Sequence, residues 1–264
     1  MWKCPSCDFI YLNPRPDSTS LRSAYQSYLP EDELGIERWR TMMMPVFSWA
    51  ADFIEKTIPK GRVLDVGTGY GHFLWEMERR GWEALGLEIS GTGVEFARTR
   101  LGVTILAGTL EESRLSDNHF DAVTAFYVIE HLDDPMAFLR ECHRVLKPEG
   151  LILIRYPHTT PIKGFLAMLG IRNRLYDTPY HLSDFSPKTM ERFLGKAGFA
   201  ACQSHIGGYT RPAYVPSRVA TRLFGSISQG LFSLSGDRFL FPGVSKTATG
   251  RKSTDLELAP SIRR

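Results

Sequence analysis

The sequence predicts an α/β fold: a Rossmann-like, seven-stranded, mostly parallel sheet with helices on both faces, after an N-terminal helical lead-in and before a partly irregular C-terminal segment. Three observations lead to this prediction. Short apolar strands alternate with amphipathic helices between residues 62 and 205, a glycine-rich turn follows the first strand, and no run of about 18 apolar residues occurs. Strands that alternate with helices pair in parallel and are covered on both faces.

Composition excludes several classes of protein. The chain has 264 residues, 43% hydrophobic and 23% charged, which excludes a disordered chain, a fibrous rod and an integral membrane protein. The formal charge of +3 is too small to indicate a nucleic-acid partner. The first residues lack the apolar core of a secretory signal, and four cysteines are too few for a disulfide scaffold. We therefore expect a cytoplasmic protein without a membrane-spanning segment.

The first part of the chain divides into a lead-in and a long helix. Residues 1–32 show no sustained period and are expected to be an irregular lead-in that carries Cys4 and Cys7. From residue 33 to 58, large apolar side chains recur every three or four residues, which predicts an amphipathic helix. Pro45 should kink this helix or divide it in two, because proline lacks the N–H that a helix interior needs.

Strands and helices then alternate. The expected strands cover residues 62–66, 83–88, 103–106, 120–126, 151–156 and 197–205. The expected helices cover residues 70–80, 93–101, 134–146 and 187–196, the last capped by Ser186 with Pro187 at its first position. These elements place a cofactor-binding domain at 33–210, with a lid at 157–186.

The C-terminal segment, residues 211–264, is predicted to be a basic extension. It carries nine basic residues and three acidic ones, and its pattern beyond Gly208 assigns no helix or strand. Such a segment fits contact with phosphate or anionic lipid, but the favoured interpretation is a solvated, partly disordered tail.

The strongest motif is the turn after the first strand, Val63–Gly71. Glycines here let the backbone approach a ligand closely, and the helix that follows offers free N–H donors. A dinucleotide site needs its third glycine at position 72, where this chain has His72, and here the third glycine is Gly71. Asp65, inside the strand, would repel a pyrophosphate but suits an ammonium group. These features favour S-adenosylmethionine over a nicotinamide dinucleotide.

Further candidate residues follow the next strands. Glu88 ends the second strand, where a carboxylate can accept both hydroxyls of a ribose. Thr109 and Leu110 follow the third strand, and the fourth ends in aromatic residues and an acid beside a histidine, within residues 120–132. All lie at carboxyl ends of parallel strands, where open α/β sheets bind ligands.

Taken together, these motifs resemble class I S-adenosylmethionine-dependent methyltransferases of the small-molecule branch. The resemblance covers about residues 50–205. It is carried by the segments 63–71, 87–90, 120–135, 146–151 and 181–186.

The resemblance implies S-adenosylmethionine as cofactor and S-adenosylhomocysteine as product. The cofactor-binding residues that it implies are Asp65, Gly67, Gly69, Gly71, Glu88, Ile89, Thr109, Leu110, Phe126 and Tyr127. The three glycines would lie against the methionine part, Asp65 would support its ammonium group, and Glu88 would hold the ribose. Thr109 and Leu110 would flank the adenine, and the two aromatic residues would line the channel near the sulfonium.

The implied reaction is in-line methyl transfer to an oxygen, nitrogen or carbon of a small molecule, in which the protein mainly aligns donor and acceptor. Where a base is needed, the candidates are His131, His158 and His181, and His131 and His181 are preferred to His158. An acceptor with an acidic group could meet Arg172 or Arg174. Two alternatives stay open: a methyltransferase-like scaffold that binds cofactor without catalysis, and, with less support, an NAD-dependent oxidoreductase.

The front end resembles half of a zinc knuckle found in this branch. Two Cys-x-x-Cys pairs form that knuckle, and here only Cys4 and Cys7 are present, before the run Asn13–Pro16. A structural zinc needs four ligands, so we interpret the pair as a remnant and expect no bound metal.

Overall fold

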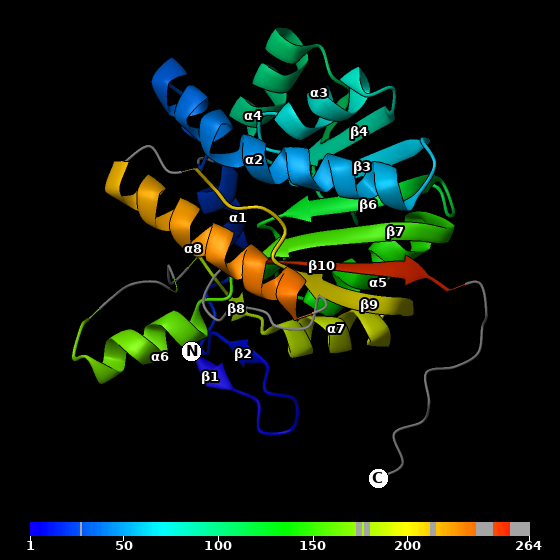
Figure 1. Ribbon diagram of the computed structural model, residues 1–264. Coiled ribbons are helices and arrows are strands. Elements are labelled where there is room, and N and C mark those ends of the chain that lie inside the picture. Colours follow the sequence, from blue (N-terminus) through cyan, green and yellow to red (C-terminus); the bar gives the residue numbers. More distant parts are fainter. Residues whose placement is uncertain (27, 173–175, 177–179, 212–214, 236–244, 254–264) are drawn as a thin grey trace.

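The computed structural model describes residues 1–26, 28–172, 176, 180–211, 215–235 and 245–253. Its centre is a seven-stranded sheet with the strand order β5-β4-β3-β6-β7-β10-β9 (Figure 1). In that order the strands are Ile105–Ala107, Glu83–Glu88, Arg62–Val66, Phe120–Phe126, Leu146–Tyr156, Lys246–Lys252 and Phe199–His205. The first five are parallel, and β10 runs antiparallel to both of its neighbours. The predicted fold class is confirmed.

Helices cover both faces of the sheet. They are α2 (Glu33–Thr57), α3 (His72–Arg79), α4 (Gly91–Phe96) with a π-turn at Ala97–Leu101, α5 (Pro135–Val145) and α7 (Pro187–Lys196). Apolar side chains of α2, α3 and α4 share one buried cluster with Val63 of β3, whereas those of α5 and α7 share another with Leu64. Because neighbouring strand residues point to opposite faces, this division sets up two cores.

Local signals explain where these helices begin. Asp32 caps α2, with its carboxylate accepting a hydrogen bond from the N–H of Gly35, and Ser186 caps α7 by accepting one from the N–H of Thr189. Pro45 lies inside α2 without dividing it, contrary to one of the two expectations. The helix continues through Pro45 because residues on both sides of it, Met43 and Phe47, are buried against the sheet.

The lead-in is more regular than expected. It contains β1 (Trp2–Lys3), β2 (Ile10–Tyr11) and α1 (Ser18–Gln26), and β2 pairs with β8 (Ser183–Asp184) in a separate three-stranded sheet. Phe9 packs on Phe185 and Phe193, with ring centroids about 5 Å apart. Strands of two residues are too short to give a periodic pattern, so the sequence did not reveal them.

The cysteine pair lies in this small sheet region. Cys4 and Cys7 are free thiols, and the Sγ of Cys4 lies 3.1 Å from the Oγ of Ser6. Over the described ranges, no third metal-binding side chain joins the pair.

The C-terminal segment contributes to the main sheet, which the sequence did not predict. β10 lies between β7 and β9, with Lys246, Thr247 and Thr249 buried. Its composition is polar and contains a glycine, so it lacks the apolar alternation by which strands are recognised. Before it comes α8 (Val215–Leu234), which lies across the left-hand side of Figure 1.

The predicted lid region, residues 157–186, contains α6 (Thr160–Met168) and β8. Residues 173–175 and 177–179 lie outside the described part, and a lid role stays a prediction. Among the described residues, no helix combines the length and the apolar character needed to cross a bilayer.

Candidate active site

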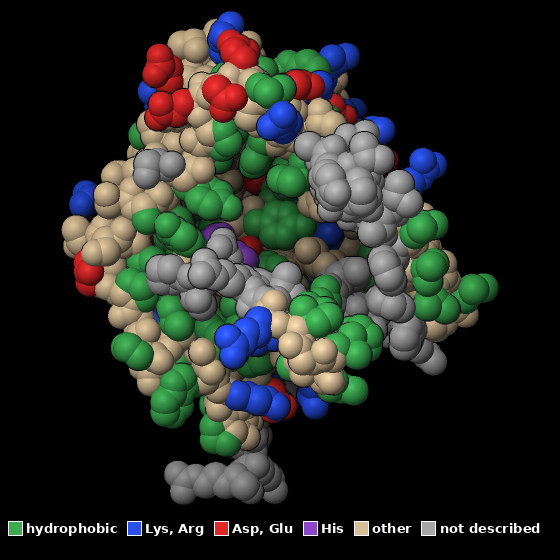
Figure 2. Space-filling model, turned by 90° about the vertical axis from the view of Figure 1, so that its left-hand side faces the viewer, with side chains coloured by type: hydrophobic (Ala, Val, Ile, Leu, Met, Phe, Trp, Pro, Cys, Tyr) green, Lys and Arg blue, Asp and Glu red, His purple; other side chains and the backbone are tan. Residues whose placement is uncertain are grey.

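A cavity of about 480 Å³ opens where the parallel strands end (Figure 2). Its wall includes Gly67 just after β3, Glu88 at the end of β4, Phe126 at the end of β6 and Pro157 just after β7. The strands therefore bring together segments that are far apart in sequence, at the edge where open α/β sheets bind ligands.

The glycine turn forms part of the cavity wall. Gly67 and Gly69 have φ angles of +68° and +59°, a region that suits glycine. A Cβ on Gly67 would lie 2.5 Å from the Cγ2 of Val128, and one on Gly69 would lie 3.2 Å from the Trp39 ring. Bare backbone is thus exposed to a ligand at a place where any side chain would intrude. This cradle fits the close approach that S-adenosylmethionine needs.

Gly71 lies at the start of α3, and its predicted contact with the cofactor stays a prediction. It does not line the cavity, and a Cβ there would lie 3.0 Å from side-chain carbons of Ala97 and Val103. Its φ angle is +79°, and it is the N-cap of α3. Gly71 lets α3 pack closely on the π-turn, so the structure gives it a packing role.

Glu88 lies in the cavity wall with its carboxylate held by backbone. The N–H groups of Gly69, Ile89 and Ser90 donate to it at 2.7, 2.9 and 2.8 Å. Burial raises the pKa of this carboxyl, and the three backbone hydrogen bonds oppose that shift. Ile89 lines the cavity next to it. A fixed carboxylate at this point is able to accept hydrogen bonds from a ligand diol.

Asp65 does not line the cavity, although the sequence placed it against the cofactor. The residue is buried, and the hydroxyl of Thr124 on the neighbouring strand β6 donates to its Oδ1 at 2.6 Å. Burial raises the pKa of Asp65 to about 7. The side chain lies within the sheet beneath the glycine turn, and direct contact with an ammonium group stays a prediction.

The two residues proposed to flank adenine also lie outside the cavity wall. Leu110 is buried in the α5 and α7 core, and the N–H of Thr109 donates to Glu112 at 3.1 Å. Core packing occupies the Leu110 side chain, and contact of Thr109 and Leu110 with adenine stays a prediction.

Phe126 and Tyr127 both line the cavity, and their place beside the sulfonium stays a prediction. The hydroxyl of Tyr127 accepts a hydrogen bond from the Nε of Arg155 at 3.2 Å. Further lining comes from the N-terminal helical region. These lining residues are Tyr25, Tyr28, Leu29, Trp39, Met42 and Met43.

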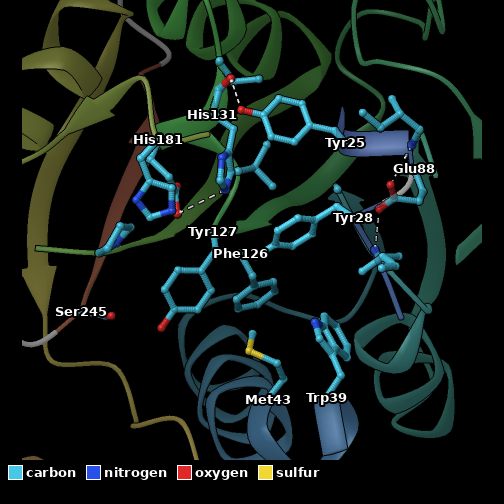
Figure 3. A pocket seen from close by; sticks show the side chains of 18 of the residues that line it. Tyr25, Tyr28, Trp39, Met43, Glu88, Phe126, Tyr127, His131, His181 and Ser245 are labelled. Atoms are coloured by element: carbon cyan, nitrogen blue, oxygen red, sulfur yellow. Dashed lines mark hydrogen bonds and ion pairs between the residues drawn. The ribbon is translucent and has the colours of Figure 1, made fainter. Parts of the chain in front are cut away.

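Opposite Glu88, an acid and two histidines converge (Figure 3). Glu130 and His131 lie on the 3-10 turn Ile129–His131, and His181 precedes β8. The rings of His131 and His181 are 4.9 Å apart, so both predicted base candidates reach the cavity. Donor atoms of the three residues all lie within 4.8 Å of one another. One carboxylate and two imidazoles form a donor set that is able to hold a divalent cation.

Glu130 is the functional candidate that sequence reasoning missed. It is 1% exposed, and neither carboxylate oxygen has a hydrogen-bond partner within the described residues. Burial raises its pKa to about 8, and the Asp184 carboxylate adds to the shift. A buried carboxyl without a partner is costly, and such groups cluster at functional sites. The sequence showed an acid beside a histidine but gave no sign of its burial.

The arginines proposed for an acidic acceptor group are not seen in the cavity. Arg172 is exposed and does not line it, and Arg174 lies outside the described residues.

Comparison with known proteins identifies the family. The profile of a methyltransferase domain family matches residues 39–204, more than half of the chain. The chain belongs to this methyltransferase family. The matched region runs from α2 to β9 and contains the glycine turn, Glu88 and the cluster around Glu130.

Relatives agree with this assignment. The methyltransferase is 28% identical over 213 residues to a ubiquinone biosynthesis O-methyltransferase of Xanthomonas campestris, covering 70% of this chain and 85% of that protein. Its fold is similar to that of an Archaeoglobus fulgidus SAM-dependent methyltransferase (20% identity, TM-score 0.56, 84% and 100% coverage). It is also similar to Haemonchus contortus phosphoethanolamine N-methyltransferase 2, solved with S-adenosyl-L-methionine (17% identity, TM-score 0.56, 89% and 60% coverage).

Proposed function

We propose that this methyltransferase transfers the methyl group of S-adenosylmethionine to a hydroxyl oxygen of a small amphipathic molecule in the cytoplasm. The observation that carries the proposal is the layout of the cavity, with Glu88 on one side and His131 and His181 on the other (Figure 3). A carboxylate oxygen of Glu130 lies within 4.8 Å of a ring nitrogen of each histidine. Aromatic side chains, Phe126 and Tyr28 among them, lie between the two sides. The relative named as an O-methyltransferase supports oxygen as the accepting atom, and four free thiols suit a reducing compartment.

The cofactor side uses backbone more than side chains. S-adenosylmethionine supplies a methyl group that its sulfonium already activates for displacement. Gly67 and Gly69 allow the close approach, Glu88 accepts hydrogen bonds from the ribose hydroxyls, and Ile89 packs beside it. Phe126 and Tyr127 shield the channel from water, which keeps the reacting atoms aligned and dry.

The acceptor side centres on His131. Its Nδ1 lies 3.1 Å from the carbonyl oxygen of Tyr180. Because a carbonyl only accepts, Nδ1 carries the proton and Nε2 keeps its lone pair. That lone pair can take the proton from the acceptor hydroxyl. Glu130 Oε1 lies 3.9 Å from Nε2, so an ionised Glu130 would stabilise the resulting imidazolium.

A small acceptor suits the cavity better than a nucleic acid does. The wall is largely aromatic and apolar, and the net charge of the chain is only +3.

The test is transfer of a radiolabelled methyl group to a panel of phenols and catechols with apolar tails. His131→Ala should lower turnover by about 10²-fold while S-adenosylhomocysteine binds as in the wild type. His119→Ala is the matched control, because His119 lies just before the opposite end of the same strand, β6. Binding of cofactor with no methylation of any acceptor would favour the non-catalytic scaffold.

A further inference from the structure

Exposed apolar side chains concentrate on two helical segments. Among the described residues, fourteen large hydrophobic side chains are exposed, and nine of them lie within 162–171 and 223–234. They are Ile162, Phe165, Met168, Leu169, Ile171, Leu223, Ile227, Leu231 and Leu234. Isolated exposed apolar residues need no explanation, but a concentration of this kind marks an interaction surface.

The α8 residues form a stripe directed away from the protein. Leu223, Ile227, Leu231 and Leu234 follow steps of four, four and three, so they lie on one helix face. The buried positions of this part of α8, Gly225, Ser228 and Phe232, lie on the opposite face. The helix therefore already packs on the protein through one side and leaves a second apolar side uncovered.

The whole of α6 lies at the protein surface. No residue of α6 is buried, and Met168 and Phe165 are 84% and 59% exposed. Because removing apolar surface from water is favourable, burial of this helix against a partner would lower the free energy.

Charge on the two segments has one sign. Neither 157–172 nor 206–235 contains an aspartate or glutamate, and together they carry five basic residues. Of these, Arg172, Arg211 and Arg222 are exposed. Apolar helix faces combined with basic side chains alone match the surface of an anionic bilayer, where head groups meet the cations and acyl chains meet the apolar residues. A surface that binds another protein does not need to lack aspartate and glutamate, as these two segments do.

Both helices begin a few residues after a residue of the cavity wall. Pro157 lines the cavity and α6 begins at Thr160, while Thr210 lines it and α8 begins at Val215. In Figure 2, hydrophobic side chains gather below and to the right of the central hollow. A surface that held both helices would therefore lie close to the mouth of the cavity.

We propose that α6, α8 and the basic residues beside them bind this enzyme reversibly to anionic lipid bilayers. The apolar faces insert at the level of the head groups, and the arginines contact lipid phosphates. On the proposed function, this position lets an amphipathic acceptor enter the cavity from the bilayer surface.

The experiment is co-sedimentation of the full chain with vesicles of phosphatidylcholine containing 30% phosphatidylglycerol (about the range in which electrostatic binding becomes measurable). We expect binding that weakens at least tenfold on vesicles of phosphatidylcholine alone or in about 0.5 M salt. The paired variants Phe165→Ser with Met168→Ser, and Ile227→Ser with Leu234→Ser, should each bind at least tenfold more weakly. Leu34→Ser is the matched control, since Leu34 is 57% exposed on α2.

Two further readouts separate this proposal from the proposed function. All variants should keep the rise in melting temperature that S-adenosylhomocysteine gives, and all should keep methyl transfer to a soluble acceptor. Wild-type protein that ignores phosphatidylglycerol vesicles, or paired variants that bind as well as Leu34→Ser, would overturn the proposal. So would a dimer, seen by light scattering without lipid, that the paired variants dissociate, because a second copy would then cover these faces.

Discussion

Glu130 and His131 are neighbours in sequence whose side chains meet at the cavity, with Glu130 Oε1 3.9 Å from His131 Nε2. The 3-10 turn that carries them follows directly after β6 and points both into the same space. Among the described residues the buried Glu130 carboxyl has no hydrogen-bond partner, and the Nδ1 of His131 lies 3.1 Å from the carbonyl oxygen of Tyr180. The site thus pairs a proton acceptor with a carboxyl that, once ionised, would stabilise the charged imidazole.

Stability should depend on pH through Glu130. Its folded pKa of about 8 lies above the ordinary value of 4.5, so between these values the folded state holds a proton that the unfolded state has lost. Stabilisation is therefore complete below about pH 4.5 and is lost as pH rises toward 8. Melting temperatures should fall from pH 5 to pH 8, and the fall should be smaller for Glu130→Gln. Parallel curves for the two proteins would refute the assignment.

Gly67→Ala should weaken cofactor binding more than it affects folding. The new Cβ meets Val128 at 2.5 Å inside the cavity, and we expect S-adenosylhomocysteine affinity to drop more than tenfold. Gly102→Ala is the matched control: its φ is +70°, and nothing lies within 4 Å of its Cβ. Both changes should cost about 1 kcal/mol of stability from backbone strain. Equal affinity of the two variants in calorimetric titration would show that Gly67 does not face the cofactor.

Gly71→Ala should act on stability alone. Its Cβ crowds Ala97 and Val103 in the core, so the loss should exceed that of Gly102→Ala by about 1–2 kcal/mol in urea unfolding. Under conditions where it is folded, this variant should bind S-adenosylhomocysteine like the wild type. If the Gly71→Ala protein is folded but has lost affinity for S-adenosylhomocysteine, the predicted contact of Gly71 with the cofactor would be supported instead.

Zinc ions should inhibit methyl transfer. The donor atoms of Glu130, His131 and His181 lie within 4.8 Å of one another, and an ion held there would occupy the lone pair that His131 needs. Micromolar zinc should slow turnover in the wild type, a chelator should restore it, and His181→Ala should weaken the inhibition at least tenfold. If a chelator alone, without added zinc, inactivates the enzyme, the claim that His131 acts as a base without a bound metal would be contradicted.

The sequence predicted those parts of the fold that carry strong periodic or punctuation signals. Apolar strands such as Arg62–Val66 and helix caps such as Ser186 can be recognised from the neighbouring residues in the sequence alone. The strand Lys246–Lys252 cannot be recognised in this way, because most of its residues are polar. They are buried only because the strand lies between β7 and β9. The lead-in was misjudged for a similar reason, since its strands have two residues each.

At the site, the sequence indicated which segments lie near the cavity better than it indicated which side chains point into it. Glu88, Phe126 and His181, which the sequence singled out, line the cavity. Asp65 instead bonds to Thr124 across the sheet, a contact that depends on the pairing of β3 with β6. The burial of Glu130 likewise depends on how distant segments pack around the turn, which no local pattern reports.

The central claim is that the cavity between Glu88 and Glu130 holds S-adenosylmethionine, and calorimetric titration with S-adenosylhomocysteine tests it most directly. We predict one molecule bound per chain, at least tenfold weaker binding by Glu88→Gln, and unchanged binding by Glu83→Gln at the exposed start of the same strand. Absence of binding by the wild type, or binding of NADH in its place, would contradict the account.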